Sequence, residues 1–145
     1  MYLGKVFVVG PTPDILLFSE DNVSQLSLAF DQSMQPLVAY QTPVGIKIRF
    51  LSIGALTPRI VQIAVAYDAK AVLDLKSSAV QPGVDARVFY LRRDLPGTLF
   101  YRSHKDNMAI EREFGAVPAG TTGLARVERM SNNRLGITFT GSFGL

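Results

Sequence analysis

The stretch Pro43–Asp68, PVGIKIRFLSIGALTPRIVQIAVAYD, decides the fold of this chain. Large apolar residues occupy every second position in each of its two halves. In the first half these are Val44, Ile46, Ile48 and Phe50, and in the second half Val61, Ile63, Val65 and Tyr67. Because successive side chains of a β-strand point to opposite faces, the pattern predicts two strands, each with one large apolar face. Their closeness in the sequence predicts that they pair as a central hairpin.

The two predicted strands differ on their other faces. Lys47 and Arg49 alternate with the apolar row of the first strand, and we expect these cations to face water. The second strand carries Gln62, Ala64 and Ala66 there, a small surface that another segment or subunit can cover. The hairpin is therefore expected to have two unlike outer faces.

The connection between these strands, 51–59, is unusually apolar for a loop. It contains Leu51, Ile53 and Leu56. Such side chains either cover one end of the core or form an exposed patch for a partner. We predict that they contact a neighbouring molecule.

Similar alternating runs and short apolar runs recur along the rest of the chain, separated by turns rich in Pro, Gly and polar residues. They cover 2–9, 14–18, 26–30, 37–40, 71–76, 84–92, 98–102, 124–130 and 135–140, and 19–22 reads as a polar turn. The pattern predicts a single all-β domain over 1–145, an antiparallel β-sandwich or jelly roll of about nine short strands. At most one short helix is expected, near 106–114, where Ile110 and Phe114 are four residues apart.

Length and composition agree with such a domain. The chain has 145 residues, of which 48% are hydrophobic, so it can bury a core of its own. It has no Cys, which excludes disulfides, thiolate nucleophiles and cysteine-based zinc sites. Neither a signal-peptide pattern nor an apolar run of about 20 residues is visible, so we expect neither secretion by a signal peptide nor a transmembrane segment.

The sequence offers little to a catalytic mechanism. The one His, His104, lies in the basic segment RSHKD, and no Gly-x-Ser-x-Gly motif accompanies it. The glycines form neither a dinucleotide-binding motif nor a P-loop. Carboxylates are scattered and do not have the spacing of a calcium loop. We expect no catalytic residue, no cofactor and no metal ion, and hence a protein that is not an enzyme.

Charge is uneven along the chain. The net charge is −1 over residues 1–85 and +4 over residues 86–145. Phe89, Tyr90, Phe100 and Tyr101 interleave with arginines there, as in proteins that stack bases in a basic groove. On alternating strands, however, about half of these aromatic side chains must point into the core. The sequence therefore argues against nucleic acid as the partner.

Three surfaces remain as candidates for binding another protein: the apolar connection, the basic region after the longest predicted strand, and the C-terminal end. Their residues are Leu51, Ile53, Leu56, Arg92, Arg93, Arg102, Lys105, Phe143 and Leu145. The strand pattern continues almost to the last residue, so the C-terminus needs a partner strand. That strand belongs either to the same chain or to a neighbouring subunit.

The series of short strands without cysteine, the turns Gln81–Gly83 and Asp94–Gly97, and the strand-like end Arg134–Leu145 resemble the small all-β virion proteins of tailed bacteriophages, in particular capsid decoration or cement proteins. The resemblance implies a sandwich or jelly-roll subunit, often a homotrimer, that sits on the outer capsid and clamps neighbouring capsomers. It implies the major capsid protein or another virion protein as partner, and the virion as location after synthesis in the host cytoplasm.

Two other functions remain open at this point. One is a different part of phage assembly, such as a head–tail joining protein or a tail-fibre domain. The other is a β-sandwich module that binds carbohydrate or another small ligand. The chain has no Trp and few Asn residues, which disfavours a sugar site.

Overall fold

The computed structural model describes residues 3–8, 15–30, 35–52, 55, 57–74, 85–131 and 134–144, without the side chains of 3–8, 15–17, 73 and 74. These residues form twelve strands and one 3-10 turn, η1 (His104–Asp106). The strands are β1 (Leu3–Val8), β2 (Ile15–Asp21), β3 (Ser24–Phe30), β4 (Pro36–Thr42), β5 (Gly45–Leu51), β6 (Pro58–Ile63), β7 (Ala66–Asp74), β8 (Asp85–Arg92), β9 (Thr98–Ser103), β10 (Arg112–Ala116), β11 (Thr121–Arg129) and β12 (Leu135–Gly141).

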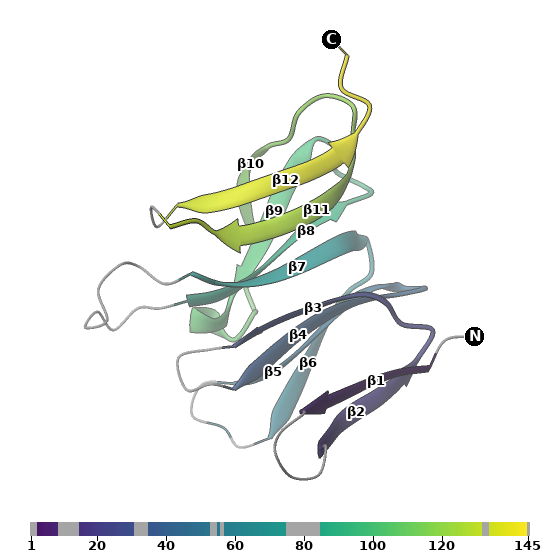
Figure 1. Ribbon diagram of the computed structural model, residues 1–145, viewed down its shortest axis with the longest axis vertical. Helices are drawn as coiled ribbons and strands as arrows, with labels where there is room; N and C mark the ends of the chain where they lie inside the picture. The colour runs from purple at the N-terminus through teal and green to yellow at the C-terminus, as the bar shows by residue number, and fades with distance from the viewer. Residues whose placement is uncertain are drawn as a thin grey trace.

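The strands stack in four layers along the long axis of the molecule (Figure 1). The hairpin β1–β2 forms one end, followed by a sheet with the order β3-β4-β5-β6. A second sheet with the order β10-β9-β8-β7 comes next, and the hairpin β11–β12 forms the other end. The predicted all-β antiparallel sandwich is thus confirmed, with a hairpin on the outer side of each sheet.

The topology of both large sheets is a simple meander. Every hydrogen-bonded pair in the described sheets joins strands that are consecutive in the chain, and every pair is antiparallel. A jelly roll requires Greek-key connections, in which sequence neighbours are separated in space. Of the two predicted architectures, the described strands therefore form the sandwich.

The deciding stretch pairs as predicted over most of its length. In β5 and β6, Ile46 lies opposite Ile63 and Ile48 opposite Val61. The second strand is shorter than expected, because β6 ends at Ile63 and a turn at Ala64 and Val65 takes the chain to the second sheet. The alternation of apolar residues continues across this turn, which hides the break in the sequence.

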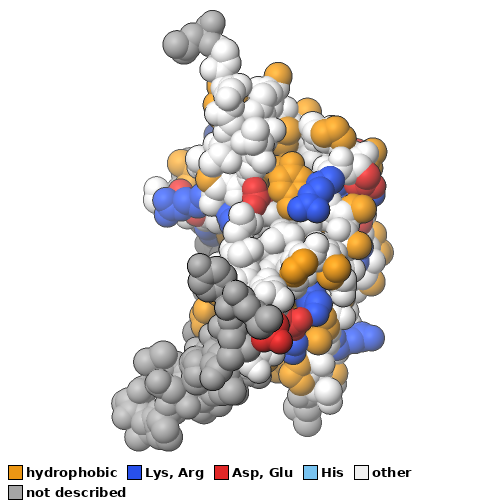
Figure 2. All heavy atoms as spheres, turned by 90° about the vertical axis from the view of Figure 1, so that its right-hand side faces the viewer, with side chains coloured by type: hydrophobic (Ala, Val, Ile, Leu, Met, Phe, Trp, Pro, Cys, Tyr) orange, Lys and Arg blue, Asp and Glu red, His pale blue; other side chains and the backbone are white. Residues whose placement is uncertain are grey.

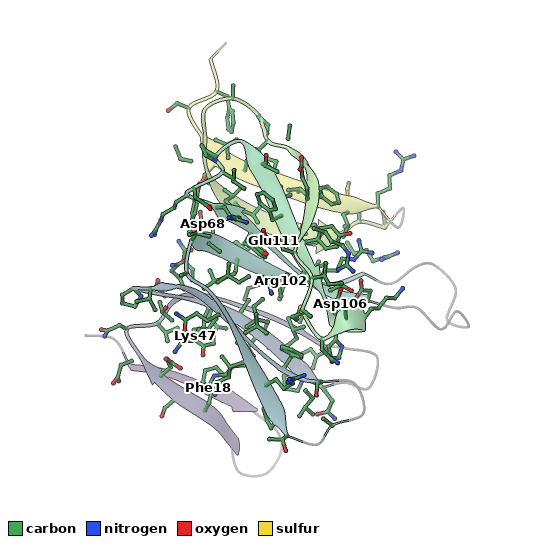
Figure 3. The ribbon with its side chains drawn as sticks, turned by 180° about the vertical axis from the view of Figure 1, so that it is seen from behind. Phe18, Lys47, Asp68, Arg102, Asp106 and Glu111 are labelled. Atoms are coloured by element: carbon green, nitrogen blue, oxygen red, sulfur yellow. The ribbon has the colours of Figure 1, made fainter. Side chains whose placement is uncertain are left out.

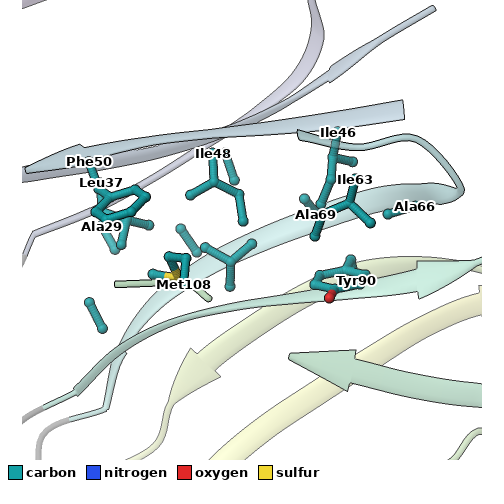
Figure 4. Packing of buried hydrophobic residues seen from close by; sticks show 14 of the residues in the cluster. Ala29, Leu37, Ile46, Ile48, Phe50, Ile63, Ala66, Ala69, Tyr90 and Met108 are labelled. Atoms are coloured by element: carbon teal, nitrogen blue, oxygen red, sulfur yellow. The ribbon is translucent and has the colours of Figure 1, made fainter. Parts of the chain in front are cut away.

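The main core fills the space between the two large sheets (Figure 4). The first sheet contributes mostly large side chains, and the second contributes several alanines that face them. The members are Ala29, Leu37, Ala39, Ile46, Ile48, Phe50 and Ile63 from the first sheet, and Ala66, Ala69, Ala71, Ala86, Val88, Tyr90 and Phe100, with Met108 after η1, from the other side. Small residues opposite large ones let the sheets approach at normal packing density.

A second core lies between the other face of the β7–β10 sheet and the hairpin β11–β12. It contains Val72, Phe89, Leu91, Leu99, Leu124 and Val127. Leu91 and Leu99 pair directly across β8 and β9. The C-terminal strand is held by the chain itself, since β12 pairs with β11 up to Gly141 opposite Thr121.

Three local expectations differ from the structure. Ser19–Asp21 belongs to β2 rather than to a turn, because Glu20 is held by partners on the neighbouring sheet. The helical turn lies at His104–Asp106, and β10 begins at Arg112 inside the stretch where a helix was allowed. The structure has twelve described strands instead of about nine, and β10 is the one that none of the predicted runs covers.

Candidate functional site

The outer face of the β3–β6 sheet carries rows of side chains that run across its four strands. Residues directly opposite each other on neighbouring strands point to the same face. One row consists of Leu28, Val38, Arg49 and Ile60. In the next row, Phe30 lies opposite Pro36, and Leu51 lies opposite Pro58. Arg49 is the one charged residue in these two rows.

The hairpin β1–β2 covers a neighbouring part of this face. The ring of Phe18 stacks on that of Tyr40 at 5.4 Å between centroids, and the guanidinium of Arg49 lies 4.3 Å from the Phe18 ring centroid. Figure 3 shows Phe18 and Lys47 in this region. The fully buried Tyr40 and Val38 pack against Phe18 and Val23.

Glu20 of β2 joins the hairpin to the sheet through charges. Its Oε1 accepts a hydrogen bond from Lys47 Nζ at 2.5 Å, and its Oε2 accepts one from Arg49 Nη2 at 2.9 Å and one from the Tyr40 hydroxyl at 3.1 Å. The Lys47 hydrogen bond, with those from Arg49 and Tyr40, holds the pKa of Glu20 below its ordinary value, against the effect of burial. Lys47 and Arg49, expected to face water, are instead partly buried partners of Glu20.

Beyond the hairpin, the same face is hollowed into a groove of about 320 Å³. Its lining is apolar except for one guanidinium and one amide: Phe18, Gln35, Pro36, Val38, Arg49, Phe50, Leu51 and Pro58. The imidazole Nε2 of His104 donates to the Leu51 carbonyl oxygen at 2.5 Å, which fixes the end of β5 at one side of the groove.

Large apolar side chains are exposed beside this groove. Leu26, Leu28 and Phe30 of β3 are 48%, 46% and 37% exposed, and Ile60 of β6 is 50% exposed. The alternation in β3 predicted a half-buried strand, but its small residues take the inner face, with Ala29 buried. The inner face lies against β7, where the Ser27 hydroxyl accepts a hydrogen bond from the Ala71 amide at 2.9 Å, so only small side chains fit.

Two of the predicted interface residues, Arg92 and Arg102, meet at a different place. The Tyr90 hydroxyl donates to Glu111 Oε2 at 2.6 Å and accepts from Arg102 Nε at 3.2 Å. Arg92 donates to both Glu111 and Asp94. Figure 3 shows Arg102 and Glu111 near the middle of the molecule. Burial is the main cause that raises the pKa of the Tyr90 hydroxyl.

The remaining predicted interface residues are dispersed. Arg93 is exposed with its guanidinium 5.8 Å from the Tyr67 ring centroid, and Lys105 is exposed in η1. Leu51 is half-buried in the groove lining, and Phe143 is exposed beyond β12. Ile53, Leu56 and Leu145 lie outside the described residues. Of the predicted interface residues that the structure describes, Leu51 lines the groove, whereas the exposed row on β3 was not predicted. The sequence signal for that row was the alternation of large residues with the small Ser27 and Ala29.

Among the described side chains, those considered for catalysis or base stacking make contacts within the fold. His104 lies edge-on to the Phe50 ring, with 5.6 Å between centroids, and binds Leu51. Three of the four aromatic residues considered for base stacking, Phe89, Tyr90 and Phe100, are buried. Among the described residues, no group of three or more His, Cys, Asp or Glu is placed to hold a metal ion. None of the same residues forms a helix with the length and hydropathy to cross a bilayer.

Acidic side chains lie next to basic ones, and hydrophobic side chains reach the surface at several places, on the face that Figure 2 shows. Comparisons of the chain with protein-family models, curated proteins and solved structures gave no match.

Proposed function

We propose that this chain is a non-enzymatic structural protein of a virion, of the capsid-decorating type, which binds and stabilises neighbouring capsid subunits. The observation that carries the proposal is the exposed apolar row of β3, Leu26, Leu28 and Phe30, beside an apolar groove. Adjoining exposed apolar side chains, with polar groups around them, are typical of surfaces that contact other proteins.

The same observation favours the β3–β6 sheet over the basic region as the contact surface. Arg92 and Arg102 donate their hydrogen bonds to Glu111, Asp94, the Tyr90 hydroxyl and the Met108 carbonyl oxygen. A partner that used these guanidinium groups would compete with internal partners. Binding through exposed apolar side chains such as Leu28 breaks no internal hydrogen bond of these side chains.

Decoration also requires many weak contacts to act together. An interface of standard size buries roughly 800 Å² on each partner. Several such contacts to neighbouring subunits raise the overall affinity through effective concentration. A homotrimer, the oligomer that the proposal expects, would present three copies of the β3 row at once.

The test uses capsid shells of the major capsid protein encoded in the same genome, assembled without this chain. Purified chain is added in increasing amounts, and the shells are sedimented. We expect saturable co-sedimentation and a higher temperature of shell disruption. An equal concentration of an unrelated small β-protein is the control. The proposal is wrong if the shells do not retain the chain, or if light scattering shows a monomer that binds sugars.

A further inference from the structure

We propose that the outer face of the β3–β6 sheet receives an extended segment of a partner protein in which apolar side chains accompany at least one carboxylate. The inference rests on the proposed function, under which the segment belongs to a capsid subunit. It adds the chemistry of the partner and the strands that bind it.

The apolar part of the surface crosses the whole sheet. Leu28 on β3 and Ile60 on β6 end the same cross-strand row, and both are exposed. Between them lies the groove, whose lining includes Val38 and Arg49 of the same row together with Pro36 and Pro58. An extended segment can reach from Leu28 to Ile60 across the sheet, whereas a compact small molecule fills only the groove of about 320 Å³.

The charges of the sheet indicate the sign of the partner. Strands β3–β6, all of whose side chains are described, carry three cations and no acid: Lys47, Arg49 and Arg59. Glu20 of the neighbouring hairpin supplies one carboxylate to two of these cations. Arg59 lies opposite Phe50, a residue of the main core, and therefore points to the inner side of the sheet. On the outer face, the cations Lys47 and Arg49 outnumber the one carboxylate of Glu20. A partner carboxylate complements this charge, and apolar partner side chains complement the rows.

The same charges argue against a second copy of this sheet as the occupant. Two such faces brought together would oppose cations to cations, and like charges across an interface disfavour association. Nucleic acid fits poorly as well, because the rows between the cations are apolar and offer few donors to phosphate.

The edge of the sheet adds a means of holding an extended segment. Among the described strands, β6 has β5 as its one neighbour, so no described strand pairs with the other side of its backbone. Pro58 has no amide hydrogen, so the donors of this edge come from the residues after it in β6. Strand addition there would lay the partner beside Ile60, with alternate side chains over the outer face.

The first experiment compares variants in the shell-binding assay. Leu28→Glu and Ile60→Glu are expected to weaken binding by roughly 30-fold. Each variant places a negative charge in an apolar contact, close to the carboxylate of the partner segment. Binding of the wild type is expected to weaken as the salt concentration rises, because Lys47 and Arg49 attract the carboxylate of the partner. Leu95→Glu, at an exposed position in the turn between β8 and β9, is the matched control and should bind as wild type does.

The outcomes separate the two proposals. If wild-type chain does not bind shells, the proposed function fails and this inference with it. If wild type binds and both Leu28→Glu and Ile60→Glu, folded by circular dichroism, bind equally well, the inference alone is overturned. Because Leu28 and Ile60 are on different strands and both exposed, loss of folding in one variant leaves the other as the test.

The second experiment identifies the occupant. A photo-crosslinking amino acid at position 60 is activated on chain bound to shells, and the linked peptide is sequenced by mass spectrometry. We expect a capsid peptide with apolar residues and Asp or Glu within a few positions of the crosslink. A crosslink to a second copy of this chain, or to a basic peptide, would contradict the inference.

Discussion

At the level of single residues, the same arrangement of side chains occurs twice. Tyr40 and Tyr90 are fully buried, and the hydroxyl of each donates to a Glu from another segment and accepts from an Arg Nε. In both cases the Arg lies opposite the valine two residues before the Tyr. A buried phenol needs hydrogen-bond partners, and an ionised carboxylate needs cations when it loses water. One arrangement meets both needs.

Tyr90→Phe tests the value of this arrangement. The change keeps the ring but removes the hydroxyl between Glu111 and Arg102. We expect a loss of about 1–2 kcal/mol in the free energy of unfolding, measured in urea, because Arg92 still pairs with Glu111. Tyr101→Phe, on the neighbouring strand, is the control and should change stability by less than about 0.5 kcal/mol. Equal stability of the two variants would show that the Tyr90 hydroxyl contributes nothing.

Glu20→Gln tests the charge that holds the hairpin β1–β2. The folded protein lowers the pKa of Glu20 below its ordinary value of 4.5, so the unfolded chain binds this proton more readily. The stabilisation is therefore complete above pH 4.5 and is lost as the pH falls through the lowered value. At neutral pH the variant should unfold with about 1–2 kcal/mol less free energy than wild type.

The gap between wild type and Glu20→Gln should close as the solution is acidified, as followed by urea unfolding at a series of pH values. Glu113→Gln, which changes an exposed carboxylate on β10, is the control. A gap that stays constant down to acid pH would mean that the carboxylate charge has no part in holding the hairpin.

At the level of elements, Asp68 explains how the hairpin β11–β12 attaches to the second sheet. Asp68 has a φ of 52°, a left-handed conformation that Asp tolerates better than most residues, at an irregularity of β7. Its Oδ2 accepts a hydrogen bond from the Leu124 amide at 3.2 Å. A Cβ at Gly123 would lie 2.4 Å from that oxygen and 2.6 Å from Thr140 Oγ1. The glycine therefore makes room for the carboxylate that joins the hairpin to β7.

Gly123→Ala should loosen this attachment. The added methyl group must displace Asp68 and Thr140, and overpacking of this kind costs about 1–3 kcal/mol. Amide hydrogen exchange in β11 and β12 should accelerate more than in β4 and β5, because the second core opens first. Gly144→Ala, where a Cβ meets no atom within 4 Å, is the control. Uniform acceleration over the whole chain would contradict a local attachment.

The elements show what periodicity can predict. Alternation located β5, most of β6 and β12 and paired the first two correctly, because one face of each is packed and the period of two is strict. It could not tell which face of β3 is buried, since that depends on the closeness of β7, where Ala29 and Ser27 fit. Nor could it bring Glu20 to Lys47, because these residues are 27 positions apart and no local pattern links them.

At the level of the whole molecule, the four layers explain two runs that break the alternation. Leu37–Tyr40 and Val88–Leu91 are buried at every position. A strand covered on both faces needs apolar residues on both, so it reads as a continuous apolar run. These runs were the sequence signal that both sheets are covered on their outer faces. The hairpins that cover the two sheets are distant in the sequence, so local patterns do not show how much of each outer face is covered. The uncovered part of the outer face of the β3–β6 sheet forms the candidate site.

Removal of residues 1–21 tests whether the hairpin β1–β2 only covers the first sheet or is required for that sheet to fold. The main core between the sheets lies in residues 29–108, so the truncated chain should keep the far-ultraviolet circular dichroism of a β-protein. It should lose about 3–5 kcal/mol in the free energy of unfolding, because Val38 and Tyr40 lose Phe18, and Lys47 and Arg49 lose Glu20. The newly exposed apolar surface should increase binding of the dye ANS. Removal of residues 143–145, beyond the last strand, should change neither quantity. A truncated chain that is fully unfolded would show that the first sheet needs the hairpin in order to form. In that case the groove would not exist without the hairpin.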